Sequence, residues 1–246
     1  MDNIPNLLWT EQFVVQSSDT DYRSQGKLSF ILEIMQRTAD AAVNALGLSL
    51  EQMRGAGMGW MLITLELEIR RMPRLSDQLT VQTWSKGTKG ALWQRDYRIY
   101  DINHEEVAVA RSIWALVDIE KRKILRPTAL PVPVIHYEGD SVGAMPDKVT
   151  ISDHISLQNA YNYQVRFCGL DSNYHLNNAR YGEICCDALS LEEWGVRELK
   201  RFRITYVQEA RFGEEIQIQR SASIAEGIFV QGAAGDKLLF TACLEF

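Results

Sequence analysis

The strongest constraint on the fold is a repeated succession of patterns, because each half of the chain runs through a short strand, a polar turn, a helix and several strands. A shift of 152 residues places the turn at 19–23 on that at 171–175, and a shift of 137 places the strand pattern of 65–69 on that of 202–206. The drop of 15 residues between the two shifts predicts a shorter helix-to-strand segment in the second half. We predict a tandem duplication of one unit, against the alternative of chance similarity between two strand-rich halves.

The first unit contains one long helix, predicted over residues 25–46 and closed by Gly47 just beyond its end. Apolar residues extend around most of this helix, which is typical of a buried helix. Alternating apolar residues predict strands joined by short turns, at 11–16, 60–70, 78–84, 91–100 and 106–119. Strands joined in this way form an antiparallel sheet. The predicted fold class is α+β, with the helix on the concave face of the sheet.

The two units are separated by a segment that is poor in regular structure. Three prolines mark the end of the first half: Pro127, Pro131 and Pro133. We place an N-terminal unit at residues 1–136, a linker at 137–159 and a C-terminal unit at 160–246, which opens with a strand at 161–167. Because the linker still carries apolar residues, we expect it to cross the molecule rather than to form a disordered tail.

Composition and charge exclude several classes of protein. The net charge of −6 argues against nucleic-acid binding. Residues 1–5 lack the basic start of a secretory signal, and no apolar run is long enough to cross a bilayer, which predicts a cytoplasmic protein without membrane insertion. The four cysteines form no CxxC pair and the four histidines show no metal-ligand spacing. We expect reduced thiols, no metal and no cofactor.

A dense polar cluster precedes the helix of the second unit. Its members are Asp171, Asn173, His175, Asn177 and Asn178. Asn177 or Asn178 is suited to cap a helix over residues 181–189, because an Asn side-chain oxygen accepts from an unpaired backbone N–H. The positive end of that helix would hold an anion or polarise a carbonyl. For each Asx residue alone, ordinary capping and turning of the chain is the simpler interpretation.

The first half has other residues at the matching positions. At the two shifts these are Arg23 for His175, Gln25 and Gly26 for Asn177 and Asn178, and Met72 for Glu209. Titratable groups suited to proton transfer are thus confined to one copy. We infer that the second unit performs the chemistry, while the first has a degenerate site and shapes a pocket.

A histidine and a carboxylate beside a helix start suit the hydrolysis of an acyl compound. His175 or a carboxylate would take a proton from water, while backbone N–H groups at the helix start hold the oxyanion. We place Glu209 on the strand that contains residues 202–206, where strict alternation leaves it off the apolar face unless a bend or bulge intervenes. A nucleophilic cysteine, Cys168 or Cys185, is the rival mechanism.

The run Asp171-x-Asn173-x-His175-x-Asn177-Asn178 resembles the active-site motif of the acyl-ACP thioesterases, double-hotdog enzymes that act on acyl carrier protein (ACP). The resemblance extends over nearly the whole chain and includes residues 9–26, the pair Gly59-Trp60 and residues 206–209. It implies a tandem hotdog fold, in which two antiparallel sheets each wrap a long helix. It also implies hydrolysis of the thioester between a fatty acyl chain and the phosphopantetheine arm of ACP, which yields free fatty acid and holo-ACP in fatty acid biosynthesis.

The resemblance also assigns roles by position. The catalytic set would be Asp171, Asn173, His175 and Glu209, and the substrate-binding residues would be Asn177, Asn178 and Trp60. Asn173 would orient the thioester or the water, and His175 would transfer protons. Either Glu209 or Asp171 would activate the water. Many plant members have a cysteine directly after the glutamate, and Ala210 at that position favours water activation over a thiol nucleophile.

The expected partner is ACP, whose acidity calls for a basic docking surface. The candidate groups are Arg70, Arg71 and Arg74; Lys121, Arg122 and Lys123; and Arg197, Lys200, Arg201 and Arg203, of which the last leads into the Glu209 strand. The acyl chain would lie in the first unit, along its helix and sheet. Three alternatives stay open: an acyl-CoA thioesterase, a hotdog dehydratase or hydratase, and a non-catalytic acyl-binding protein. Because the duplication already builds a dimer-like pair, a monomer or a homodimer is compatible with the sequence.

Overall fold

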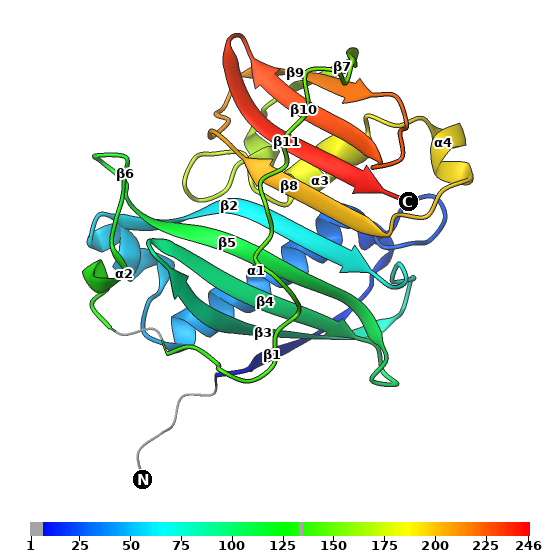
Figure 1. Cartoon of the computed structure of the whole chain (residues 1–246). Coiled ribbons are helices and arrows are strands. Elements are labelled where there is room, and N and C mark those ends of the chain that lie inside the picture. Colours follow the sequence, from blue (N-terminus) through cyan, green and yellow to red (C-terminus); the bar gives the residue numbers. More distant parts are fainter. Residues whose placement is uncertain (1–6, 133–134) are drawn as a thin grey trace.

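The computed structural model describes residues 7–132 and 135–246 (Figure 1), so the expectations for residues 1–5 and for Pro133 lie outside the described part of the chain. The first unit contains β1 (Trp9–Val14), η1 (Ser17–Asp19), α1 (Leu28–Ala45), α2 (Leu50–Gly55), β2 (Met58–Ile69), β3 (Gln78–Lys89), β4 (Leu92–Tyr100), β5 (Glu106–Asp118), β6 (Lys123–Ile124) and η2 (Pro127–Ala129). The second contains β7 (Leu157–Gln164), η3 (Phe167–Gly169), α3 (Arg180–Cys186), α4 (Leu191–Gly195), β8 (Arg201–Tyr206), β9 (Glu215–Ser221), β10 (Ile228–Ala234) and β11 (Lys237–Glu245). Among the helices of these described ranges, none combines the length and the apolarity needed to cross a membrane.

The α+β class and the antiparallel pairing are confirmed. Each strand pairs antiparallel with its neighbours, and α1 lies against the concave face of the first unit's strands (Figure 1). The N-terminal half of α1 is buried on nearly all sides, as its apolar pattern predicts, with Ile31 and Ile34 fully buried. The helix begins three residues later than predicted, because Lys27 N–H still bonds to Asp19 O in the preceding turn.

The two predicted sheets are one continuous sheet. Its strand order is β1-β3-β4-β5-β2-β8-β11-β10-β9-β7, and the antiparallel pairing of β2 with β8 joins the halves (Figure 1). Side chains reinforce this junction, since Thr64 Oγ1 lies 2.7 Å from Thr205 Oγ1 and Arg201 binds Glu68 at 3.2 Å. The alternation of each strand predicts a buried face but carries no information about which edge meets which, so the fusion of the sheets could not be read from it.

The second unit's helix is shorter than the predicted long helix. α3 has 7 residues, whereas α1 has 18. The stretch from Asn177 to Ser190 is nine residues shorter than the equivalent stretch from Lys27 to Ser49, so the chain reaches the next capping serine sooner. This shortening accounts for nine of the residues by which the shift of the downstream strands is smaller.

The segment between the units crosses the outer face of the sheet, on the side away from α1 (Figure 1). Val149 is buried and is held from both sides, because its N–H donates to Thr205 Oγ1 at 2.9 Å and its carbonyl accepts from Thr241 Oγ1 at 2.7 Å. Earlier in the same segment, Val142 N–H donates to Asp96 Oδ2 at 3.1 Å. β7 begins at Leu157, inside the segment predicted as linker, and ends at Gln164.

Candidate active site

A tight polar turn presents His175 in the second unit. Asp171 Oδ1 accepts from the backbone N–H of Asn173 at 2.7 Å and from that of His175 at 3.3 Å. The Asp171 N–H donates in turn to His175 O at 2.8 Å, which closes the turn. Tyr174 takes the left-handed conformation, with φ of 63°. Asp171 is thus the residue around which the turn is built.

Glu209 lies in a loop and not on a strand as predicted. β8 ends at Tyr206, because the N–H groups of Val207 and Gln208 both donate to Leu239 O, at 2.8 and 3.1 Å, and the chain bends out of the ladder. This bend supplies the break in alternation that the sequence required. The duplication already indicated that Glu209 lies outside the strand, because the matching residue Met72 lies beyond the predicted end of the first unit's strand at residue 70.

His175 and Glu209 meet where the turn is joined to this loop. Leu176 N–H donates to Ala210 O at 2.8 Å, and His175 Nε2 lies 3.2 Å from Glu209 Oε2. The two side chains are 24 % and 35 % exposed, so small molecules have access to both. A partly exposed His–carboxylate pair is suited to transferring protons to and from a bound water or a leaving group.

Two arginines of the first unit reach into the same group. Arg122, which lies between β5 and β6, donates to Glu209 Oε2 at 2.7 Å. Arg54 of α2 donates to Asn173 Oδ1 at 3.1 Å and also to the carbonyl of Ser172. The candidate site therefore lies between the units. The sequence marked Arg122 only as a basic surface residue and did not mark Arg54, because these contacts join residues 87 and 119 positions apart.

The two asparagines predicted to cap the helix have other positions. The N-cap of α3 is Ala179, so neither asparagine is the cap. Asn177 Oδ1 accepts from Ala179 N–H at 2.8 Å and so closes the turn one step before the helix. The carbonyl of Asn178 accepts from Tyr206 Oη at 3.1 Å. In the first turn of α3, the N–H of Arg180 already donates to Asn177 O at 3.0 Å.

Trp60 lies outside this hydrogen-bonded group. Its indole packs edge-on against Trp93, with ring centroids 5.3 Å apart. Both belong to an apolar cluster beneath α2, separate from the main core, whose buried members are Leu48, Met53, Met58, Trp93, Leu116 and Leu130. The structure thus gathers the four predicted catalytic residues and places Trp60 in the wall of an apolar region.

The hydrogen bonds also correct the register of the two turns. Asp21 Oδ1 accepts from the N–H groups of Arg23 and Gln25, at 2.8 and 3.0 Å, just as Asp171 does from the matching residues of its own turn. The turns therefore match at a shift of 150 residues and not 152. Gln25, and not Arg23, stands at the position of His175.

The cysteines predicted as rival nucleophiles differ in their surroundings. Cys185 is fully buried, and burial raises the pKa of its thiol well above the ordinary value. Burial also raises the pKa of the adjacent Cys186 thiol to about 12. A thiol that stays protonated at neutral pH is a weak nucleophile, which argues against Cys185 in that role. Cys168 is exposed, in η3.

Two family models match the chain. The acyl-ACP thioesterase N-terminal domain matches residues 6–129, and the acyl-ACP thioesterase C-terminal domain matches residues 152–233. The chain belongs to the acyl-ACP thioesterase family. The family expected from the polar run at residues 171–178 is confirmed, and the two matches leave residues 130–151 between them.

Solved structures of acyl-ACP thioesterases have the same double hotdog fold as this chain. An acyl-ACP thioesterase from Bacteroides thetaiotaomicron is 20 % identical, with a TM-score of 0.84 over 97 % of each chain. The 12:0-ACP thioesterase from Umbellularia californica is 16 % identical, with a TM-score of 0.77 over 97 % of this chain and 96 % of that one. A chloroplastic acyl-[acyl-carrier-protein] hydrolase, FATB3, of Cuphea viscosissima is 23 % identical over 82 % of this chain. The chain spans 52 % of the length of that relative.

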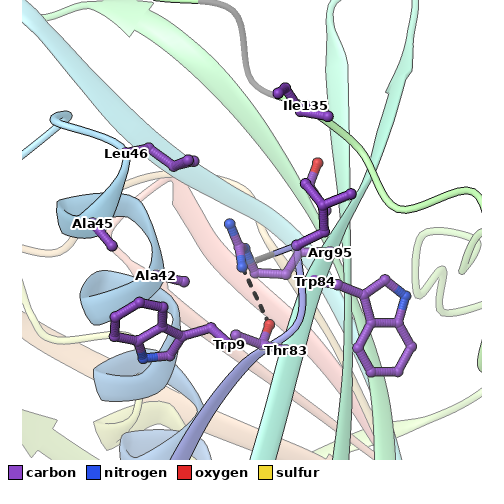
Figure 2. Close-up of a pocket in the computed structure, with 10 residues that line it drawn as sticks. Trp9, Ala42, Ala45, Leu46, Thr83, Trp84, Arg95 and Ile135 are labelled. Atoms are coloured by element: carbon purple, nitrogen blue, oxygen red, sulfur yellow. Dashed lines mark hydrogen bonds between the residues drawn. The ribbon is translucent and has the colours of Figure 1, made fainter. Parts of the chain in front are cut away.

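A cavity of about 100 Å³ lies in the first unit of this acyl-ACP thioesterase family member, between the C-terminal half of α1 and the strands β3 and β4 (Figure 2). Ala42 and Ala45 line it from the helix. Thr83 and Arg95 line it from the sheet, and Arg95 donates to Thr83 Oγ1 at 3.3 Å. The first unit thus has open space along its helix, in the region where the acyl chain is expected.

Most of the predicted docking cations are paired with carboxylates. Arg201 and Arg203 both contact Glu245, at 3.7 and 2.9 Å, and Lys200 binds Glu198 at 3.0 Å. This pairing lowers the net positive charge of the group that leads towards Glu209, which was our preferred docking surface. Arg122 differs, since its carboxylate partner is Glu209 of the candidate site.

Proposed function

We propose that this chain hydrolyses the thioester of acyl-ACP and releases a free fatty acid and holo-ACP. The observation that carries the proposal is the contact of His175 Nε2 with Glu209 Oε2 at 3.2 Å, at a partly exposed position where both units meet. Membership of the acyl-ACP thioesterase family supports the same reaction.

In the proposed mechanism Glu209 is the general base. Its carboxylate takes a proton from a water molecule, and the oxygen of that water attacks the thioester carbon. The tetrahedral intermediate then expels the pantetheine thiolate, which receives a proton from protonated His175. The proton taken up by Glu209 passes to His175 across their 3.2 Å contact, which restores both groups. The products are a carboxylic acid and a thiol. Arg122 holds the Glu209 carboxylate at 2.7 Å and fixes its position beside the histidine.

Asn173 is proposed to bind the carbonyl oxygen. Arg54 donates to Asn173 Oδ1 at 3.1 Å, which leaves the amide nitrogen as the group that faces a substrate. An amide donor that faces the developing oxyanion is commonly worth about a hundredfold in rate. The role first expected for the helix start is less well supported, because the Arg180 N–H is already bonded.

Asp171 is the weaker candidate for the base. Its Oδ1 is engaged by two backbone N–H groups. Asp21 makes the same two bonds in the first unit, whose turn has neither the histidine nor the glutamate. A carboxylate with the same contacts in both turns is better explained by the shape of the turn than by chemistry.

The test measures thiol release from lauroyl-ACP and palmitoyl-ACP and from the corresponding CoA esters. We expect hydrolysis of the ACP substrates, a loss of at least about a hundredfold for Glu209→Gln and for His175→Ala, and a loss below about tenfold for Asp171→Asn. An Asp171→Asn loss as large as that of Glu209→Gln would assign the base to Asp171. Much faster turnover of the CoA esters would exclude the carrier assignment. Formation of an enoyl product from a 3-hydroxyacyl substrate would favour a dehydratase.

The acyl chain is proposed to lie in the first unit, beside α1. The cavity lined by Ala42, Thr83 and Arg95 supports this, because it continues the inner face of β4 from Trp93 along the helix. The proposed units have the limits 1–136 and 160–246, although β7 of the second unit begins three residues earlier, at Leu157. The segment between the units lies on the face of the sheet opposite to α1 and the proposed acyl-chain site (Figure 1).

A further inference from the structure

Two tryptophans of the first unit have indole N–H groups without a hydrogen-bond acceptor. Four of the six indoles donate to an identified acceptor: Trp9 to Glu11 Oε1, Trp84 to Asp140 O, Trp114 to Ser112 Oγ and Trp194 to Cys186 O. Among the residues that the structure describes, the Nε1 atoms of Trp60 and Trp93 are buried and have no partner. Both belong to the same apolar cluster beneath α2.

A buried N–H without an acceptor is unfavourable, because it has lost its bond to water and gained none. Trp93 is 8 % exposed, and the two rings pack edge-on with their centroids 5.3 Å apart. The buried neighbours in this cluster are leucines and methionines, including Met58 and Leu116, and supply no side-chain oxygen or nitrogen acceptor. Two such donors in one place form a site that an acceptor atom on a ligand would satisfy.

Two segments of the first unit connect the cluster to the candidate active site. Met53, one of its buried members, is adjacent in the chain to Arg54, which binds the turn that carries Asn173. Leu125, which packs against the cluster, follows the β5–β6 turn whose Arg122 binds Glu209. Helix α2 and the segment from Arg122 to Leu125 therefore both line the cluster and contact the candidate site.

In the sheet, Trp60 lies on the side of the β2–β8 junction from which the loop of Glu209 leaves β8. The pairing of β2 with β8 ends at Thr64 opposite Thr205, and β8 itself ends at Tyr206. Trp60 lies four residues before Thr64 on β2, beyond this last pair. It is therefore on the path that leads from the loop of Glu209 into the first unit.

We propose that the indole N–H groups of Trp60 and Trp93 donate to an oxygen atom of the bound acyl thioester. The inference rests on the proposed hydrolysis and names the substrate groups that the enzyme selects. The acceptor is either the thioester carbonyl or an oxygen at carbon 3 of the chain, as in a 3-oxoacyl or 3-hydroxyacyl group. In the second case the enzyme prefers oxygenated chains, because a saturated chain leaves both donors unpaired.

The kinetic test compares dodecanoyl-ACP with 3-oxododecanoyl-ACP for Trp60→Phe and Trp93→Phe. A loss of about tenfold in kcat/KM with both substrates assigns the acceptor to the thioester carbonyl. The same loss confined to the 3-oxo substrate assigns it to the oxygen at carbon 3. Trp114→Phe is the matched control, because Trp114 packs against the same cluster but already donates to Ser112 at 2.7 Å. Equal effects of all three substitutions, or no effect of the first two, would overturn the inference.

A second measurement uses the wild-type protein and does not depend on hydrolysis. The indole N–H signals of the ¹⁵N-labelled chain are recorded with acyl-pantetheine analogues in which an amide replaces the thioester. We expect the signals of Trp60 and Trp93 to move downfield on binding, while those of the four paired indoles stay in place. Binding without movement of these two signals would overturn the inference. If the protein hydrolyses no acyl thioester but these signals move, the proposed function fails and the donor role stands.

Discussion

The two turns that precede the helices share a backbone and differ in their side chains. Each is built on an aspartate, Asp21 or Asp171, that accepts from the same two backbone positions. Each has a residue in the left-handed region at the same point, Ser24 with φ of 58° and Tyr174 with φ of 63°. The scaffold of the site is therefore present twice. The proposed chemistry depends on three positions where the side chains differ: Arg23 against Asn173, Gln25 against His175, and Met72 against Glu209.

The short helices α4 and α2 make opposite contacts with the two turns. In the first unit Arg23 of the turn donates outward to the carbonyl of Trp194 in α4 at 2.7 Å, and its guanidinium lies over that indole ring. In the second unit Arg54 of α2 donates inward to Asn173 of the turn. The first turn is thus filled by its own arginine, whereas the second is left partly exposed between arginines from the other unit. The two turns thus keep one backbone shape, and their side chains decide whether the turn is filled or left partly exposed.

Exchanging the side chains between the turns tests this contrast most severely. We expect His175→Gln with Glu209→Met to lower acyl-ACP hydrolysis by at least about a hundredfold, because the pair that moves protons is removed. The reverse change, Gln25→His with Met72→Glu, should add no activity when combined with the first, because Arg23 still fills the turn. Thiol release from lauroyl-ACP measures both. Recovery of activity in the combined variant would show that Arg23 does not block the first turn.

The capping boxes of the two short helices differ by one charge. Glu193 of α4 stands where α2 has Gln52, and it accepts from Arg220 at 2.6 and 2.8 Å, which lowers the pKa of its carboxyl to about 2. Because the folded pKa lies below the unfolded one, this pair stabilises the protein above about pH 4.5, and the stabilisation is lost as the pH falls towards 2.

We expect Glu193→Gln to lower the free energy of unfolding by about 2 kcal/mol at pH 7, after allowance for the partial exposure of the pair, and by much less near pH 2. Denaturant unfolding at several pH values measures the difference. Gln52→Glu is the matched change in the first unit, where Thr83 stands at the position of Arg220, and it should alter stability by less than about 0.5 kcal/mol. A pH-independent loss for Glu193→Gln would assign the effect to packing.

Substitution of Arg122, the arginine of the first unit that contacts Glu209, should lower the rate less than substitution of the His175–Glu209 pair. Arg122→Gln removes the donor that holds the carboxylate at 2.7 Å, and we expect kcat to fall by about tenfold. Lys121→Gln is the matched control, because Lys121 is adjacent, pairs with Asp118 and is 72 % exposed. Steady-state kinetics on one acyl-ACP distinguishes the two. Equal losses would mean that Arg122 acts through general surface charge, as in docking of the acidic carrier, and not through Glu209.

The smallest effect is expected at the position after the glutamate. Ala210 is fully buried, and its carbonyl accepts from Leu176, just as the carbonyl of Pro73 accepts from Gly26 in the first unit. In both units the residue at this position acts through its backbone carbonyl, which accepts the hydrogen bond. Ala210→Cys should therefore change kcat by less than about twofold, apart from a modest loss of stability from the added sulfur atom. A large gain in rate that iodoacetamide abolishes would instead support a thiol nucleophile.

Local patterns predicted the elements of the fold well. The helix at 25–46 and the strands at 60–70 and 106–119 match α1, β2 and β5 to within a few residues, because the periodicity of buried positions is recorded in adjacent residues. The continuity of the sheet was not predicted, since the pairing of β2 with β8 depends on strand edges far apart in the chain. The length of α3 was overestimated for a similar reason, because apolar residues continue past Cys186 into the turn that leads to α4.

The candidate site was predicted as a set of residues but not as a geometry. The polar run identified Asp171, Asn173 and His175, and the duplication identified Glu209. The predicted alignment of the two turns was wrong by two residues, because the shift of 152 was chosen to align the identical residues Asp19 and Asp171. Hydrogen-bonding roles decide the matter, since it is Asp21 that holds the first turn.

The fused sheet has a consequence for how such an enzyme changes over time. In a symmetric dimer of identical subunits, every substitution occurs at both sites at once. The pairing of β2 with β8 keeps the same arrangement within one polypeptide, where each half is inherited and mutated separately. Selection on the proposed acyl-chain lining of the first unit then leaves the residues of the second turn untouched. Specificity and chemistry can diversify independently.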